Sequence, residues 1–245
     1  CFEDNWPWLG DYDMNDVVIV SRIDRMTSKD GGKVSALTIN WELRAAGTTY
    51  DIAGAVQMDK VQTSDVAGVV SSHEGFGSGA FASRGLDADS PCAVIPFFNR
   101  TEELLSASNT WKGQPAAAIR KHTTTVTFSQ PVDIASVLDS EMNFFIAPKQ
   151  RTSEIHMPGY APTASGIIGK GSFLPSDPYK FFVTEGDQTK NNYMMWALMI
   201  PGEFRYPAET NDIRGVYEYF MAWASSNGAE HAEWYLESAD AGRIY

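Results

Sequence analysis

The sequence has little of what several common kinds of site require. Only two of its 245 residues are cysteines, Cys1 and Cys92, and no CxxC or Cys/His spacing for a zinc site occurs. The two thiols either form one disulfide in an oxidising compartment or are unrelated, and both readings stay open. No run of about 18 apolar residues is present, which excludes a transmembrane helix.

Positive charge is also scarce. Lys and Arg number 19 against 31 Asp and Glu, which gives a formal net charge of −12, and the basic residues do not cluster. Binding to nucleic acid needs a basic patch, so this class of partner is excluded, and docking on anionic lipid is disfavoured for the same reason. An acidic surface instead suits a soluble protein that attracts cations.

Alternation of apolar and polar residues predicts many strands. From Leu37 to Arg44 every second residue is apolar, the pattern of a half-buried strand, and Ile52–Met58 repeats it after a Gly-Thr-Thr turn. We expect these two strands to be antiparallel neighbours. Further strands are expected at Val17–Val20, Val66–Val70, Ala93–Phe98, Thr123–Ser129, Met142–Ala147, Tyr179–Val183 and Tyr193–Ile200.

Helical periodicity is confined to the C-terminal part. Apolar residues recur at helical spacing from Ile213 to Ala224, with Thr210 or Asn211 as a cap and Asn227–Gly228 as a stop. A second short helix is expected from Ala229 to Leu236. We therefore predict a mainly β fold over residues 1–245, a single domain built as a jelly-roll-like β-sandwich with a short C-terminal helical segment.

The most informative segment is an acidic loop at the start of the chain. Like charges in contact near a surface cost about 1–4 kcal/mol per pair, and a hard cation that takes six to eight oxygen ligands removes this cost. The loop therefore predicts a Ca²⁺ site. Five carboxylates and one amide make up the candidate ligands: Glu3, Asp4, Asp11, Asp13, Asn15 and Asp16.

The spacing is not that of an EF-hand. An EF-hand loop requires Gly where Asp16 stands and Glu where Arg22 stands, and a β-branched run follows here in place of a helix. The alternative is an ordinary acidic turn, in which Asp and Asn side chains bind the backbone beside Gly10. The spacing alone leaves both interpretations open.

Three motifs in order along the chain resemble the LruC-type domain of bacterial secreted and surface proteins. FEDNWP followed by GDYDMNDVV opens the chain, EIHMPGYAPT occupies residues 154–163, and WALMIP followed by FRYPAE occupies residues 196–209. The resemblance implies a domain of unknown function with a loop similar to calcium-binding loops. It implies Asp11, Asp13, Asn15 and Asp16 as the first ligands, with Glu3 or Asp4 completing the shell.

Two further groups of residues are candidates for a role. Glu154 and His156 form a possible second site, although the favoured interpretation of His156 is a side chain that holds the turn at Pro158–Gly159 through a hydrogen bond. Trp6 and Trp8 are expected to pack over the acidic loop.

The sequence favours a non-catalytic, calcium-binding module in an extracytoplasmic position, at the bacterial cell surface, associated with the outer membrane, or secreted. Adhesion, or recognition of a glycan or of a surface protein, is the expected role. Two alternatives stay open. One is a carbohydrate-active enzyme in which calcium is structural and an Asp/Glu pair does the chemistry. The other is a surface-fibre subunit whose exposed strand edge pairs with a neighbour.

Overall fold

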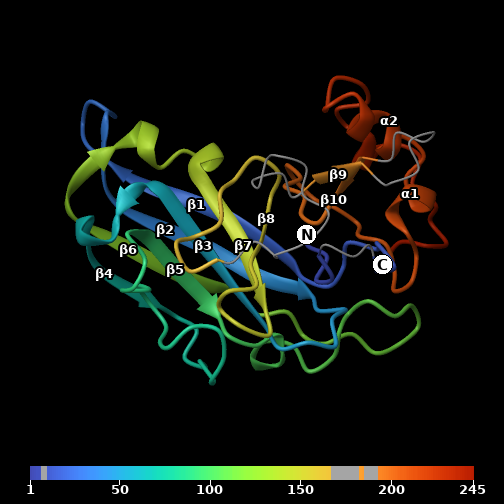
Figure 1. The fold of residues 1–245 in the computed structure, drawn as a ribbon, viewed down its shortest axis with the longest axis horizontal. Coiled ribbons are helices and arrows are strands. Elements are labelled where there is room, and N and C mark those ends of the chain that lie inside the picture. Colours follow the sequence, from blue (N-terminus) through green and yellow to red (C-terminus); the bar gives the residue numbers. More distant parts are fainter. Residues whose placement is uncertain (7–9, 167–181, 185–192) are drawn as a thin grey trace.

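The computed structural model describes residues 1–6, 10–166, 182–184 and 193–245, and the described part is mainly β (Figure 1). Two antiparallel sheets pack face to face, which confirms the predicted β-sandwich. The first sheet has the order β1 (Val18–Thr27), β2 (Lys33–Ala45), β6 (His122–Asp133), β4 (Val66–Ser71). The second has the order β5 (Cys92–Phe98), β3 (Ile52–Gln62), β7 (Met142–Pro148), β8 (Ile155–His156).

The core lies between the two sheets and follows from the alternation in the sequence. In β2, Leu37, Ile39 and Trp41 are at most 2% exposed and face the second sheet. Val56 of β3 and Ile146 of β7 meet them from the other side. Removing these side chains from water is the main contribution to the stability of the sandwich.

The predicted pairing of the strands at 37–44 and 52–58 is wrong. β2 pairs with β1 and β6, whereas β3 pairs with β5 and β7 in the other sheet. The physical reason is the composition of β3, in which every residue from Ile52 to Met58 is buried. A strand covered on both faces and both edges needs a central place in its own sheet, so the chain crosses between the sheets at residues 46–51.

Most predicted strands are present within a few residues of their expected ends, and β1 and β10 differ most. β1 extends to Thr27, beyond the predicted end at Val20. The prediction stopped short because β1 is an edge strand, and its mostly exposed residues give no apolar alternation. β10 (Tyr193–Met195) is shorter than expected, because residues 196–198 pair with the N-terminal segment instead. It pairs with β9 (Phe182–Thr184); residues 179–181 of the strand expected there lie outside the described residues.

The C-terminal helix is broken in two, as α1 (Ile213–Val216) and α2 (Phe220–Ser225). Tyr217 is extended between them, since it bridges to Ala239 and its hydroxyl donates to the Arg205 carbonyl oxygen, so tertiary pairing overrides the helical pattern. The cap is Asp212, whose carboxylate accepts from the Arg214 amide, and not Thr210 or Asn211.

The end of this region agrees better with the sequence. Asn227 and Gly228 have φ angles of 54° and 82°, as a left-handed helix stop requires. The expected helix at 229–236 is reduced to one 3₁₀ turn, η5. The 3₁₀ turns of the described chain are η1 (Thr63–Asp65), η2 (Thr101–Glu103), η3 (Ile134–Ser136), η4 (Asp139–Glu141) and η5 (Trp234–Leu236).

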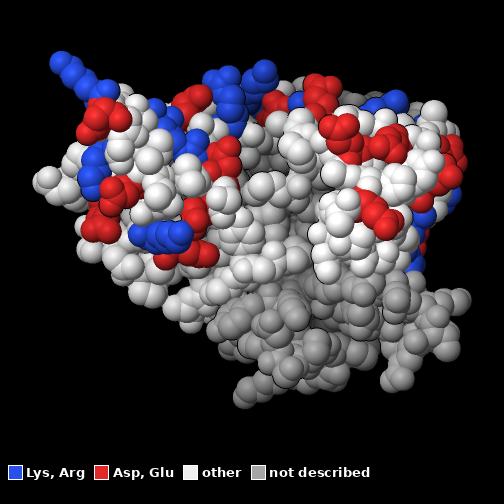
Figure 2. Space-filling view, turned by 90° about the horizontal axis from the view of Figure 1, so that it is seen from above, with Lys and Arg blue, Asp and Glu red and all other residues white. Residues whose placement is uncertain are grey.

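The two cysteines are free thiols, far apart in the fold: Cys1 pairs with the segment around Leu198, and Cys92 begins β5. Among the described residues, no helix has the length and apolar character needed to cross a membrane. On the face shown in Figure 2, acidic and basic side chains are interspersed, without a continuous positive patch.

Candidate metal centre

The acidic loop is held in place by two buried apolar side chains that alternate with its carboxylates. Tyr12 and Met14 are fully buried, and both adopt positive φ angles, of 54° and 57°. The Tyr12 hydroxyl accepts from the Met195 amide at 3.0 Å, and its ring packs edge-on against Phe220 of α2. Left-handed backbone at non-glycine residues is costly, and the surrounding packing maintains it here.

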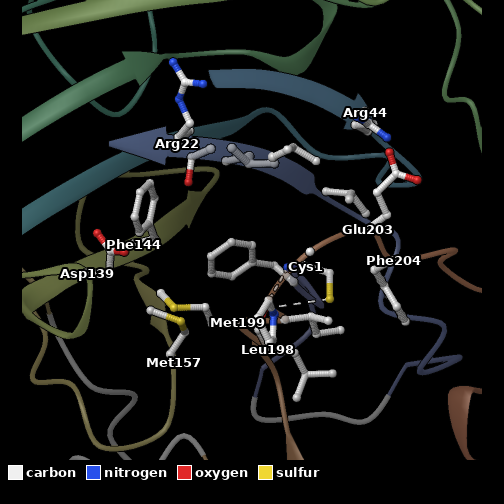
Figure 3. Close-up of a pocket in the computed structure, with 18 of the residues that line it drawn as sticks. Cys1, Arg22, Arg44, Asp139, Phe144, Met157, Leu198, Met199, Glu203 and Phe204 are labelled. Carbon is white, nitrogen blue, oxygen red and sulfur yellow. Dashed lines mark hydrogen bonds between the residues drawn. The ribbon is translucent and has the colours of Figure 1, made fainter. Parts of the chain in front are cut away.

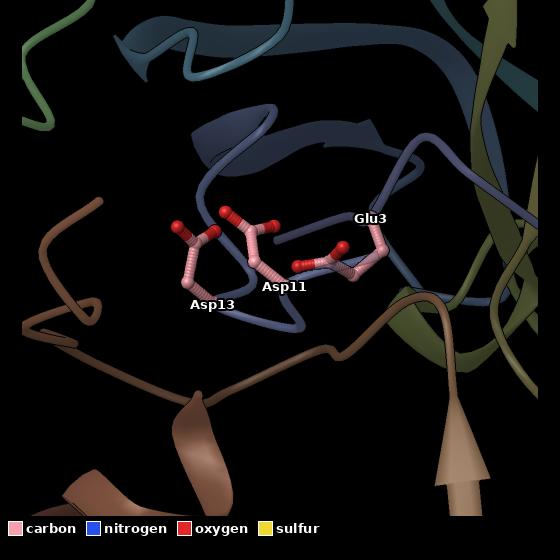
Figure 4. Close-up of side chains that lie close together, drawn as sticks. All are labelled: Glu3, Asp11 and Asp13. Atoms are coloured by element: carbon pink, nitrogen blue, oxygen red, sulfur yellow. The ribbon is translucent and has the colours of Figure 1, made fainter. Parts of the chain in front are cut away.

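Three of the predicted ligands meet in space. Glu3, Asp11 and Asp13 each place one carboxylate oxygen within 4.8 Å of the other two (Figure 4). Glu3 and Asp13 are buried, whereas Asp11 is exposed, so the group is reached from solvent on the Asp11 side. Carboxylate oxygens converging in this way are the donors that a hard cation such as Ca²⁺ prefers.

The backbone fixes both buried members. The Glu3 amide donates to the Trp196 carbonyl oxygen at 2.9 Å, and Glu3 Oε1 accepts from the Met14 amide at 2.5 Å. Asp13 Oδ2 accepts from the Thr210 amide at 2.8 Å. Glu3 Oε2, in contrast, is buried and has no hydrogen-bond partner among the described residues. A buried carboxylate oxygen without a partner is costly, and either a proton or a cation would remove this cost.

The pKa values of the clustered carboxylates also indicate a need for a proton or a cation. Burial raises the pKa of Glu3 well above its ordinary value, and Asp16 and Asp13 raise it further. Burial, followed by the charge of Asp11, raises the pKa of Asp13 to about 7. Within the described chain no Lys or Arg forms an ion pair with Glu3, Asp11 or Asp13. The cluster must therefore take up protons or a cation to be stable.

Asp4 and Asp16 form a separate pair beside this group. The Asp4 amide donates to Asp16 Oδ2 at 2.8 Å, and the Thr48 hydroxyl donates to Asp4 Oδ2 at 2.5 Å. Burial and the nearby Asp4 raise the pKa of Asp16 to about 8. Lys149 is close enough to oppose the rise in the pKa of Asp4. The six predicted ligands are thus divided among the three-carboxylate group, this pair and Asn15.

Asn15 lies beside a different part of the chain. Its Nδ2 donates to the Pro207 carbonyl oxygen at 3.1 Å, and its backbone carbonyl oxygen accepts from the Gly47 amide at 3.0 Å. The sequence analysis did not predict that Thr48 or Thr210 contacts the acidic loop. For Thr210 the FRYPAE motif at 204–209 could have indicated such a role, because the motif ends directly before this residue.

The remaining candidates have well-defined surroundings. His156 Nδ1 is 2.6 Å from Asn143 Oδ1, and its Nε2 is 3.0 Å from Glu154 Oε2. Glu154 also binds Arg151 and Thr163, and both Glu154 and His156 are buried. These contacts favour the interpretation that His156 holds this segment of chain.

The tryptophans of the N-terminal segment are the last of these candidates. Trp6 is partly buried and packs against the core, in agreement with the expected packing role. Trp8 lies outside the described residues.

An apolar groove of about 780 Å³ is lined in part by the N-terminal segment (Figure 3). Phe2 lines the groove, while the adjacent Glu3 belongs to the carboxylate group, so one short segment serves both features. The Cys1 thiol lies in the groove, 3.8 Å from the Leu198 carbonyl oxygen. Charged side chains among its lining residues are Arg22, Arg44, Asp139 and Glu203.

A family model described as "Domain of unknown function (DUF4842)" matches residues 32–235. The chain belongs to the DUF4842 family. The comparisons name no LruC-type family, so of the expected assignment the membership in a family of unknown function is confirmed. No curated protein sequence matches this DUF4842 chain.

One solved structure is similar over the whole DUF4842 chain. It is a crystal structure named as that of a "Putative lipoprotein from Bacteroides ovatus", with a TM-score of 0.73 and 19% sequence identity. The match covers 100% of this chain and 74% of the other. At this identity the likeness establishes a shared fold and no more.

Proposed function

We propose that this domain is a non-catalytic, calcium-binding module of an extracytoplasmic bacterial protein. The observation that carries the proposal is Glu3 Oε2, a buried carboxylate oxygen without a hydrogen-bond partner that borders two other carboxylates. A proton would neutralise one oxygen of the group, whereas Ca²⁺ would satisfy several at once. The exposed Asp11 gives the ion a path from solvent.

In this proposal the ion stabilises the folded protein. Glu3 is hydrogen-bonded to Trp196 and Asp13 to Thr210, so an ion held by both carboxylates would bind only after distant segments have come together. A ligand that binds only the folded state stabilises it by about 2.7 kcal/mol at a hundredfold excess over Kd. Folding would then depend on a calcium-rich surrounding, which suits an extracytoplasmic protein.

The proposed setting rests on two further observations. The N-terminal, central and late motifs resemble the LruC-type domain of secreted and surface proteins. The similar solved structure is named a "Putative lipoprotein". We propose the same extracytoplasmic setting for this chain, at the cell surface or secreted.

Thermal melts in EDTA and across a Ca²⁺ titration test the calcium site. We expect the melting temperature of the wild type to rise with Ca²⁺, and the rise to be absent in the double variant Asp11→Asn/Asp13→Asn. The matched control is Asp24→Asn/Asp30→Asn, which removes two exposed carboxylates outside the loop. An unchanged melt in the wild type after chelation would refute the proposal.

The proposed partner is a glycan or a surface protein. Trp111 is 47% exposed and follows Thr110, whose hydroxyl donates to Glu209 in the segment before α1, so one exposed aromatic side chain is close in sequence to a contact of that segment. Exposed aromatic rings are common in recognition surfaces. Screening a glycan array with and without Ca²⁺, for the wild type and Trp111→Ala, tests this part. Binding that is indifferent to both changes would place recognition elsewhere.

A further inference from the structure

The Asn15 side-chain oxygen is a second buried polar atom of this region. Asn15 is 0% exposed, its Nδ2 donates to the Pro207 carbonyl oxygen, and its Oδ1 accepts no hydrogen bond from the residues that the structure describes. Exchanging the two ends of the amide would not help, because Oδ1 would then face the Pro207 carbonyl oxygen. The protein therefore holds an amide oxygen in its interior in an orientation that the donor end fixes.

Glu209 faces the same space as this oxygen. A Cβ atom added to Gly47 would lie 2.0 Å from Asn15 Oδ1 and 3.0 Å from Glu209 Oε2, so both oxygens border the space that the glycine leaves open. Among the described residues, the donor to the Glu209 carboxylate is the Thr110 hydroxyl, at 2.6 Å from Oε2. In the described part of the chain no hydrogen-bond donor lies between the Glu209 carboxylate and the Asn15 amide oxygen, although both are acceptors.

Glu209 also belongs electrostatically to the acidic cluster. Burial raises its pKa, and the charges of Asp11 and Asp4 raise it further. Glu209 in turn contributes to the raised pKa of Asp13. Its position is fixed by its own amide, which donates to the Thr110 carbonyl oxygen at 3.0 Å. It thus adds a sixth carboxylate to the five of the N-terminal loop.

We propose that Glu209 and the Asn15 side-chain oxygen are direct ligands of a divalent cation held in this cluster. The inference rests on the proposed calcium site and extends it to the segment before α1. Carboxylate and amide oxygens are both ligands that Ca²⁺ takes, and a cation between them replaces an oxygen–oxygen repulsion with two favourable contacts. The ion then joins the N-terminal loop to the C-terminal region.

Measured calcium affinities test whether Glu209 is a ligand separately from whether the protein binds Ca²⁺ at all. Kd is measured by competition with a chromophoric chelator for the wild type, Glu209→Gln and the control Glu203→Gln, an exposed residue of the same segment. We expect Glu209→Gln to bind Ca²⁺ roughly 10- to 100-fold more weakly and Glu203→Gln to bind as the wild type does. Equal affinities for the wild type and Glu209→Gln overturn this proposal and leave the calcium site standing. A wild type that binds no Ca²⁺ refutes the proposed function as well.

Lanthanide luminescence distinguishes a ligand from a residue that only positions others. The lifetime of bound Tb³⁺ in H₂O and D₂O gives the number of water molecules on the ion. We expect Glu209→Ala and Asn15→Leu each to gain about one water, because a hard cation keeps its number of oxygen ligands. A weaker affinity without any change in hydration would mean that Glu209 acts through its neighbours, and would overturn the proposal.

Discussion

The amide of Thr210 donates a hydrogen bond of 2.8 Å to Asp13 Oδ2, across a sequence separation of 197 residues. Asn15 Nδ2 reaches the Pro207 carbonyl oxygen in the same way. The acidic loop is therefore not an isolated turn, because its geometry depends on the segment that precedes α1. A site that forms in this manner responds to changes in both parts of the chain.

The stability of the metal-free protein should fall as pH rises from about 4 to about 8. The pKa values of Asp13 and Asp16 are about 7 and about 8 in the folded protein, above the value near 4 of an unfolded chain. Over this range the folded state binds more protons than the unfolded state, so the free energy of unfolding decreases with increasing pH. Ca²⁺ displaces these protons, so stabilisation by Ca²⁺ should increase with pH.

Melts in EDTA and in Ca²⁺ between about pH 5 and about pH 8 measure both trends. In EDTA, Asp13→Asn should have a flatter dependence on pH than the wild type, because it lacks one of the titrating groups. A wild type and an Asp13→Asn variant with the same slope would contradict the assignment of this dependence to Asp13.

Replacing Gly47 with Ala should weaken Ca²⁺ binding and lower stability. The added Cβ would lie 2.0 Å from Asn15 Oδ1, far inside contact distance, and would push Asn15 away from Glu209. The matched control is Gly68→Ala in β4, where an added Cβ meets nothing within 4 Å. Chelator competition and thermal melts of the two variants check the prediction, and equal effects at both positions would speak against it.

His156 should remain neutral throughout the range in which a histidine in water titrates. Burial lowers its pKa to about 3, and the ring stacks on Phe145 while binding Asn143. In a proton NMR titration from about pH 5 to about pH 8, one imidazole signal should therefore not shift. His156→Gln identifies that signal by its loss. A His156 signal that moves over this range would show that the site opens to solvent.

Ile39→Ala should destabilise the sandwich by about 2–5 kcal/mol, the usual cost of removing a large aliphatic side chain from a core. Ile39 is fully buried at the centre of β2, whereas Met26 on β1 is 66% exposed. Met26→Ala should therefore change the free energy of unfolding by less than about 0.5 kcal/mol. Urea unfolding curves with unchanged slopes give both values, and comparable losses at the two positions would be inconsistent with the described core.

The sequence predicted which segments are strands better than it predicted their partners. The alternation over Leu37–Arg44 identified β2, and the same pattern over Ile52–Met58 identified β3, although β3 is buried on both faces there and not half-buried. The pairing of β2 with β6 depends on packing between segments about 90 residues apart, for which local periodicity gives no information. The helix at 213–224 failed for a related reason, because the bridge from Tyr217 to Ala239 is tertiary.

The sequence likewise indicated some members of the candidate site and not others. Of the six residues predicted as ligands, Glu3, Asp11 and Asp13 lie together in the three-carboxylate group. Spacing alone left the metal site and the ordinary acidic turn both open, and the motif resemblance indicated these residues. Glu209 could not be found by spacing, because it reaches the loop through contacts of Thr110 and Gly47. Any one of the 31 acidic residues could have occupied that place as far as composition shows.

The pairing of Cys1–Glu3 with Trp196–Leu198 also sets the order in which the molecule can assemble. Residues 1–3 find their partners only after the chain has been synthesised as far as Trp196–Leu198. Contacts between such distant segments slow folding, because a long loop must close before they contribute. During that interval the acidic segment stays in water, and its final geometry is among the last features of the molecule to form.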